Sequence, residues 1–219
     1  MIVFSPIQKQ QYKSRNLLLE LLSTIISSYE AIDTAIRSKN PEKYLIKVFS
    51  NEKKYEESFP PIKDYILKGF LQAPLGKDLR RNIAYFQILN SYKTINKFTV
   101  QISRYILETK NEKLSFDWIK NFLTVIINKL KKILIILEKE DVDLIKEIIQ
   151  NDSDVNILFE DAISNIIHTK TLNPKKTQDI REKEINILLI TKNLERTGDK
   201  IREIANQIYF IATGEEYFV

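Results

Sequence analysis

The sequence contains no cysteine, a single histidine and few residues that break helices. Among 219 residues there are only four glycines and six prolines. Without cysteine the chain can form no disulfide, thiolate metal site or cysteine nucleophile, and this absence fits a reducing compartment. Any bound metal must therefore be held by oxygen ligands or by His168. The scarcity of glycine and proline favours long helices joined by short connections.

Long hydrophobic runs are also missing. The most apolar run, residues 132–137, is far shorter than the ~20 residues that a membrane-spanning helix needs. The amino terminus lacks the basic and then apolar pattern of a signal peptide, so we expect a cytoplasmic protein. The 34 basic and 29 acidic residues give a net charge of +5, which fits a lysine-rich surface and would also suit an anionic partner.

Apolar residues recur at helical spacing in three stretches of the first half, and the same patterns return in the second half. Residues 18–36 return as 119–137, residues 48–59 as 148–159, and residues 85–106 as 187–208. An acidic residue interrupts both copies of the second stripe, Glu52 in one and Asp152 in the other. Because three stripes match in the same order, we interpret the chain as an internal repeat.

The repeat predicts an all-α fold made of two tandem three-helix bundles, since a three-helix unit of this length can bury its own core. We place the first bundle at residues 1–109 and the second at residues 110–219. The pair Pro60-Pro61 should kink or break the second helix, and Gly214 is well placed to end the last one.

One short segment of the last predicted helix has the pattern of a cation site. Glu195 and Asp199 are four residues apart, so on a helix they share a face, and Gly198 lies between them at a cost to helix stability. The second helix of the same repeat carries Asp152 and Asn156 at the same spacing. Packed together, these four side chains would offer three carboxylates and an amide oxygen to a hard metal ion.

The first repeat has different residues at the equivalent positions. Its second helix carries Glu52 and Glu56, but Lys93 and Lys97 replace the acidic pair on its third helix. We predict that the lysines pair with the two glutamates and take the place of a metal. A single acidic pair on a helix is more often a solvated face than a metal site. The prediction of a metal site in the second repeat therefore depends on three features together: the acidic residue on helix two, the acidic pair on helix three and the glycine within that pair.

Two stretches resemble the PhoU family of phosphate-signalling regulators. The segment from Asn193 to Lys200, NLERTGDK, with IATGE at 211–215, resembles the carboxy-terminal signature of that family. The segment LQAP at 71–74, leading into Asp78-Leu79-Arg80, is similar to the family's connection between its second and third helices. The resemblance spans nearly the whole chain.

The resemblance implies a metal site in the second bundle. Its ligands would be Glu195 and Asp199, with Asp152 and Asn156 at the acidic positions of helix two. The bound ion would be divalent or trivalent, with Mg, Mn, Ca, Fe and Zn left open. The first repeat departs from the family at its lysines, and Lys200 stands where the family usually has histidine.

The resemblance also implies a function. It is that of a non-enzymatic, cytoplasmic regulator of phosphate uptake and signalling, which binds the phosphate ABC transporter and, where one exists, a sensor histidine kinase. We expect a homodimer, no nucleic-acid partner, and membrane contact only through these partners. The alternative is a helical metal-binding or interaction scaffold unrelated to phosphate. A nucleic-acid binder fits less well, because the basic residues form no single stripe.

Overall fold

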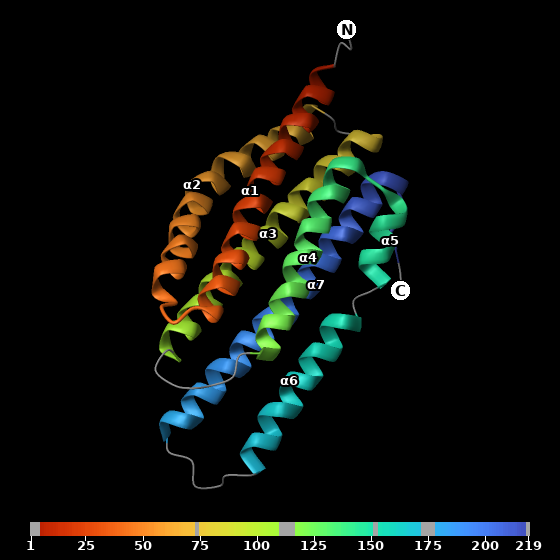
Figure 1. Ribbon diagram of the computed structural model, residues 1–219. Helices are drawn as coiled ribbons and strands as arrows, with labels where there is room; N and C mark the ends of the chain where they lie inside the picture. The colour runs from red at the N-terminus through yellow and green to blue at the C-terminus, as the bar shows by residue number, and fades with distance from the viewer. Residues whose placement is uncertain (1–4, 73–74, 110–116, 151–152, 172–177, 218–219) are drawn as a thin grey trace.

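The computed structural model describes residues 5–72, 75–109, 117–150, 153–171 and 178–217. The side chains at 117, 153, 165–171 and 178–183 are outside this description. Every regular element in the described ranges is an α-helix, which confirms the predicted fold class. The helices are α1 (Pro6–Arg37), α2 (Glu42–Gln72), α3 (Gly76–Glu108), α4 (Asp117–Lys139), α5 (Val142–Gln150), α6 (Ser153–Thr171) and α7 (Gln178–Thr213) (Figure 1).

The helix ends follow the predicted repeat. α1 ends at Arg37 and α4 ends at Lys139, 102 residues later, while α3 and α7 begin at Gly76 and Gln178, also 102 residues apart. The first helix begins with a capping box between Ser5 and Gln8, in which each side chain accepts a hydrogen bond from the backbone N–H of the other residue. The last helix ends directly before Gly214, whose φ of 88° is the left-handed conformation that glycine adopts readily.

At Pro60-Pro61 the second helix of the first repeat was expected to kink or break. α2 runs through Pro60 and Pro61 without a break, although Figure 1 shows it bending along its length. Tyr55 and Ile62, on either side of the prolines, are buried, and this packing holds the helix together where an isolated peptide would break.

The second helix of the second repeat is described in two parts. α5 ends at Gln150 and α6 begins at Ser153, with residues 151–152 outside the described ranges. The acidic position expected at Asp152 lies in this gap, so its place on the helix stays a prediction.

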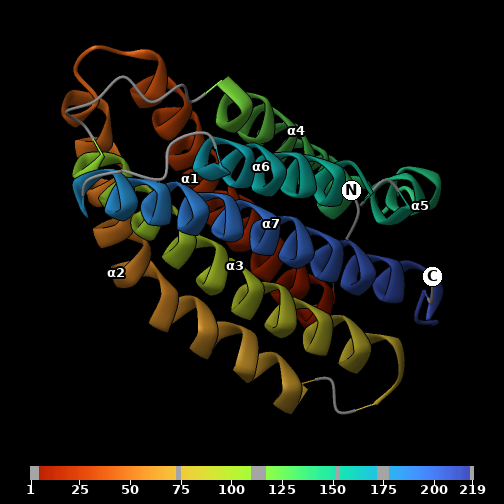
Figure 2. The same ribbon diagram turned by 90° about the horizontal axis from the view of Figure 1, so that it is seen from below.

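The helices form an inner group of four with a helix layer on each side. α1 and α3 of the first repeat pack against α4 and α7 of the second. α2 covers α1 and α3 on one edge, and α5 and α6 cover α4 and α7 on the opposite edge, as the two views show (Figure 1, Figure 2). The two repeats therefore face each other through their first and third helices.

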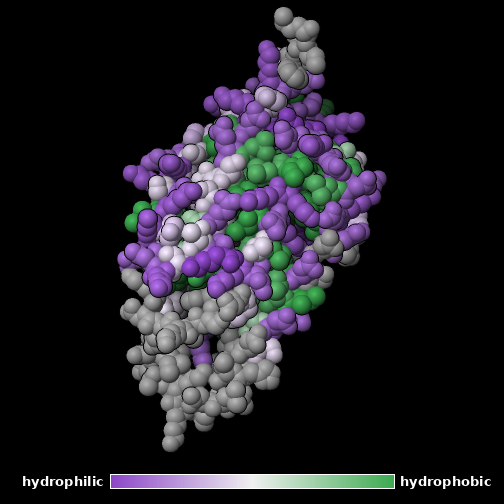
Figure 3. Space-filling model, viewed as in Figure 1, coloured by the Kyte–Doolittle hydropathy of each residue, from purple (hydrophilic) through white to green (hydrophobic). Residues whose placement is uncertain are grey.

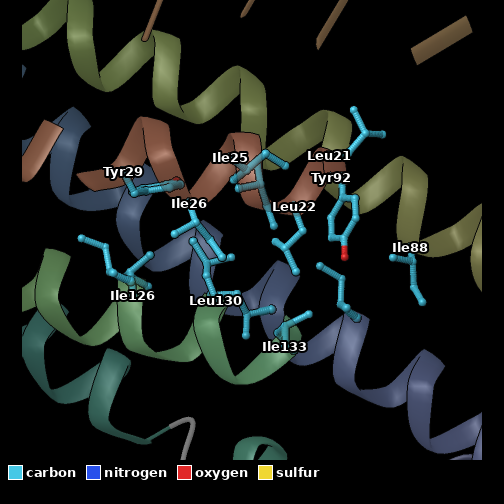
Figure 4. Close-up of a cluster of buried hydrophobic side chains, with 14 of the residues drawn as sticks. Leu21, Leu22, Ile25, Ile26, Tyr29, Ile88, Tyr92, Ile126, Leu130 and Ile133 are labelled. Carbon is cyan, nitrogen blue, oxygen red and sulfur yellow. The ribbon is translucent and has the colours of Figure 1, made fainter. Parts of the chain in front are cut away.

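One continuous hydrophobic core fills the space between the repeats. Figure 4 shows Leu22, Ile25 and Tyr29 of α1 beside Ile126 and Leu130 of α4, and all five side chains are fully buried. Polar links cross the same boundary, because Arg81 of α3 forms an ion pair with Glu140 next to the end of α4. The proposed division at residue 109 thus separates sequence repeats that share one core, and whether either half folds alone stays a prediction.

No helix among the described residues is both long enough and apolar enough to cross a membrane. On the face seen in Figure 3, hydrophobic side chains gather near the middle and hydrophilic residues surround them. Among the exposed large apolar residues are Ile135 of α4, with 42% exposure, and Ile157 of α6, with 56%.

Candidate functional site

The acidic pair of α7 lies on one face of the helix, as its spacing predicted. The side chain of Glu195 is 16% exposed and that of Asp199 is 42% exposed. Lys192 Nζ lies 2.9 Å from Glu195 Oε2, but this contact lacks the geometry of a hydrogen bond, so this buried carboxylate oxygen has no hydrogen-bond partner. Arg202 Nη2 lies 3.6 Å from Asp199 Oδ1. Both carboxylates therefore have a cation beside them.

Gly198 between the two acids has a clear packing role. A Cβ atom at this position would lie 2.7 Å from Cγ1 of Val155 on α6, closer than real carbon atoms approach. Val155 is buried and β-branched, so its side chain cannot rotate away from the added Cβ as a long flexible side chain could. The glycine is thus kept because α6 and α7 touch there, and this contact sets the α6 face opposite the acidic pair.

Thr197 of the same segment connects the two repeats. Its hydroxyl lies 2.7 Å from the hydroxyl of Tyr29 on α1, and both side chains are fully buried. Thr197 also donates to the backbone oxygen of Asn193, so Tyr29 is the donor in the shared bond. Burial raises the pKa of Tyr29, while its bond to Thr197 acts slightly in the other direction. The sequence showed no sign of this partner, because Tyr29 fell on an ordinary apolar stripe.

The helix-two side of the predicted metal site is only partly described. Asn156 lies on α6, one residue after Val155, and is exposed. Asp152 lies outside the described residues, so its relation to Glu195 and Asp199 stays a prediction. In the described ranges, no group of three or more His, Asp or Glu residues could hold a metal ion. Lys200 pairs with Glu203 at 2.6 Å and faces a carboxylate of its own helix.

The equivalent part of the first repeat forms a pocket of about 410 Å³ between α2 and α3, which we call the α2–α3 pocket. All four residues that the sequence placed together line it. The lining residues are Glu52, Tyr55, Glu56 and Phe59 of α2, and Lys93, Asn96, Lys97, Val100, Gln101 and Arg104 of α3. At the positions of Val155 and Gly198 this repeat has Tyr55 and Asn96, a much bulkier pair.

The predicted ion pairs inside this pocket are not formed. In the structure as described, neither Lys93 nor Lys97 lies within 4.0 Å of a carboxylate oxygen of Glu52 or Glu56. Instead, Lys93 Nζ lies 5.3 Å from the centre of the Phe59 ring. The spacing of these residues predicted that their charges lie on facing helices. It could not predict that the distance across the pocket is too long for ion pairs.

Two residues that line the pocket each carry a polar group without a partner. The hydroxyl of Tyr55 and Oδ1 of Asn96 are buried and have no hydrogen-bond partner among the described residues. The two residues are 3% and 6% exposed. Burial raises the pKa of Tyr55, so its hydroxyl stays protonated. Sequence reasoning missed Tyr55 and Arg104, because it looked for residues that could bind metal.

Comparison with protein families identifies the second repeat. A model of the PhoU domain matches residues 119–208, which run from α4 to near the end of α7 and include the acidic pair. Residues 119–208 of this chain are therefore similar to a PhoU domain. It is also 27% identical over 150 residues to a curated protein from Borreliella burgdorferi, the phosphate-specific transport system accessory protein PhoU homolog. That alignment covers 65% of this chain and 66% of the relative.

Solved structures of this family share the whole fold. The phosphate transport system regulatory protein PhoU from Streptococcus pneumoniae superposes with a TM-score of 0.87 at 16% identity, covering 97% of this chain and 100% of that one. PhoU from Pseudomonas aeruginosa gives a TM-score of 0.75 at 16% identity, with coverage of 95% and 96%. The fold of these PhoU structures therefore extends over both repeats of this chain, including the first repeat, which lies outside the residues of the family match.

Proposed function

We propose that this protein regulates phosphate transport, as a binding protein without catalytic activity of its own. The observation that carries the proposal is the PhoU domain of residues 119–208, together with a curated relative whose name assigns it to phosphate-specific transport. The fold gives further support, since both matched structures are PhoU proteins and align over nearly the whole chain.

The partner in this proposal is the phosphate ABC transporter, with a sensor histidine kinase as a second partner where the organism has one. The regulator acts in the cytoplasm and reaches the membrane only through these proteins. Exposed apolar side chains such as Ile135 and Ile157, on helices of the second repeat, provide surface suited to protein contact. In this reading the shared core holds the helices rigid while their outer faces bind and release partners. We also propose that the protein acts as a homodimer.

Metal binding at the second repeat is part of the same proposal. Glu195 and Asp199 would hold the ion, with Asp152 and Asn156 supplying further oxygen donors from the α6 side. The donor set fits a hard cation, and Glu195 Oε2 is a buried oxygen that still lacks a hydrogen-bond donor. Lys192 would have to withdraw from that oxygen when an ion binds, since it lies 2.9 Å away.

The direct test of the function is binding between purified proteins. The full chain is immobilised and presented with the ATP-hydrolysing subunit of the phosphate ABC transporter from the same organism, and the ATP-hydrolysing subunit of an unrelated importer serves as control. We expect retention of the phosphate-transporter subunit alone. Equal retention of both subunits, or of neither, would count against the proposal and favour a scaffold unrelated to phosphate.

Elemental analysis tests the metal site separately. The full chain is loaded with Mn²⁺ or Fe²⁺, desalted, and compared with Glu195→Ala/Asp199→Ala and with a control, Glu57→Ala/Asp64→Ala, that removes two carboxylates from α2. We expect metal to stay with the unmodified chain and the control, and to be lost from the first variant. Equal metal content in all three proteins would disprove the site.

A further inference from the structure

The α2–α3 pocket has a size and a lining that suit a small organic molecule. Its volume of about 410 Å³ lies within the usual range for small-molecule sites, roughly 300–1,000 Å³. Phe59 and Val100 supply apolar contact surface, and most of the remaining lining is charged or polar. The regulatory role proposed above does not use this pocket, so its chemistry has to be explained separately.

One wall of the pocket is a row of cations. Lys93, Lys97 and Arg104 follow one another along α3 and all three line the pocket. Within the part of the chain that the structure describes, none of them has an ion pair or a hydrogen bond. Lysines four residues apart on a helix lie about 5–6 Å from each other and can contact the same anion. The guanidinium group of Arg104 adds a planar donor pair that suits phosphate oxygens.

The opposite wall is acidic. Glu52 and Glu56 lie one helical turn apart on α2, and neither has an ion pair or hydrogen bond in the described ranges. Carboxylates accept hydrogen bonds and repel anions, so a bare anion would be held by one wall and repelled by the other. A molecule that satisfies both walls carries negative charge at one end and hydrogen-bond donors at the other.

Two residues that line the pocket also carry buried polar atoms without partners. The Tyr55 hydroxyl and Asn96 Oδ1 are buried without a hydrogen-bond partner among the described residues, although buried polar groups are nearly always hydrogen-bonded. Their polar atoms add to the polar character of the lining.

We propose that the α2–α3 pocket binds a hydroxylated phosphate monoester, of the chemical class that includes sugar phosphates and nucleoside monophosphates. Its phosphate lies against Lys93, Lys97 and Arg104, and its hydroxyl groups donate to Glu52 and Glu56. A phosphate monoester offers three terminal oxygens to the cationic wall, whereas a carboxylate offers two. The carbon skeleton covers Phe59 and Val100, which a bare phosphate ion cannot reach.

Isothermal titration calorimetry on the full chain at low ionic strength tests this proposal. The probes are adenosine 5′-monophosphate, glucose 6-phosphate and inorganic phosphate. We expect at least one ester to bind, and inorganic phosphate to bind at least about tenfold more weakly than that ester. The ester that binds more tightly identifies the source of the ligand. Absence of binding by both esters, or equal affinity for inorganic phosphate, would overturn the proposal.

Matched variants locate the site. Lys93→Gln/Lys97→Gln is expected to weaken ester binding at least about tenfold, because two charge-assisted contacts are lost. Lys53→Gln/Lys54→Gln removes the same charge from exposed positions of α2 outside the pocket and should change affinity less than about twofold. Equal weakening by the two pairs would mean non-specific attraction and would refute the pocket as the site.

The acidic wall and the second repeat provide two further readouts. Glu52→Gln/Glu56→Gln should strengthen the binding of inorganic phosphate, because the two carboxylates no longer repel the anion. The ratio of ester affinity to inorganic phosphate affinity should fall, because the hydroxyl groups of the ester lose their charged acceptors. Glu195→Ala/Asp199→Ala should leave ester affinity unchanged, which separates this proposal from the metal site of the second repeat. An unchanged preference in the first variant would contradict the role given to the glutamates. A loss of ester binding in the second would move the site away from α2 and α3.

Discussion

At the residue scale, the bond between Tyr29 and Thr197 ties the family motif of α7 to the first helix of the other repeat. Both hydroxyls are fully buried, and their 2.7 Å separation is that of a good hydrogen bond. Such a bond contributes only about 0.5–1.5 kcal/mol by itself, but leaving a buried donor unsatisfied costs about 1–3 kcal/mol. The side chain of Thr197 therefore stabilises the contact between the two repeats.

Thr197→Val and Tyr29→Phe are predicted to have unequal effects. The valine variant keeps the shape but leaves the Tyr29 hydroxyl without an acceptor, so we expect a loss of about 1–3 kcal/mol in unfolding free energy. The phenylalanine variant should lose less, about 0.5–1.5 kcal/mol, because Thr197 still donates to Asn193. Urea unfolding of both variants and of the double variant measures this difference. A larger loss for Tyr29→Phe than for Thr197→Val would contradict the assigned donor and acceptor.

At the element scale, the contact of α6 with α7 depends on Gly198. We predict that Gly198→Ala destabilises the protein by about 1–3 kcal/mol, although alanine is the better helix former, because its Cβ would overlap Val155. Thermal or urea unfolding measures the change. The double variant Gly198→Ala/Val155→Ala should be more stable than the sum of the single effects implies, since shortening Val155 makes room for the new methyl group. Additive effects would show that the two side chains do not compete for one space.

The apolar patterns in the sequence predicted where helices form better than they predicted where helices bend or end. The apolar stripes and their offset foretold α1, α3 and α7, because burial of one face fixes the spacing of apolar residues. The second stripe of the second repeat, residues 148–159, lies partly on α5 and partly on α6, with residues 151–152 outside the described ranges. At Pro60 and Pro61 a kink or a break was expected, and α2 bends without breaking because tertiary packing on both sides keeps it helical.

The candidate sites were predictable to a similar degree. Spacing placed Glu195 beside Asp199, and the repeat brought Glu52, Glu56, Lys93 and Lys97 to one pocket. It did not predict the distances between these charges, because four-residue periodicity states which face a side chain occupies and nothing about the gap between helices. The contribution of Arg104 and Tyr55 to the pocket likewise depends on how α2 and α3 pack, which only the structure shows.

At the scale of the whole molecule, the two repeats share one core. Helices α1 and α3 bury their inner faces against α4 and α7, so neither repeat can unfold without exposing apolar surface of the other. We predict a single cooperative unfolding transition in urea. Fluorescence of Trp118, the only tryptophan, reports on the second repeat, and circular dichroism at 222 nm reports on all helices. The two probes should give the same midpoint, and two separated midpoints would show that the repeats are independent domains.

Seen as a whole, the molecule carries different chemistry on its two repeats. The second has the acidic pair of the PhoU motif with Gly198 between, and the first has lysines at the same positions and a pocket beside them. The repeat relates these positions, and we propose that the same place on a three-helix unit binds a cation in the second repeat and an anion in the first. The fold shared with the solved PhoU structure covers both halves, and the role in phosphate transport is our proposal for the protein as a whole.

The most direct test of the central claim is phosphate uptake in cells of the source organism. Initial uptake of radiolabelled phosphate is measured in phosphate-rich medium for the parent strain, a strain lacking this protein, and the same strain with the coding sequence restored. We predict that loss of the protein raises the initial rate and that restoration returns it to the parental value. An uptake rate that is identical in all three strains would contradict the assignment of this protein to the control of phosphate transport.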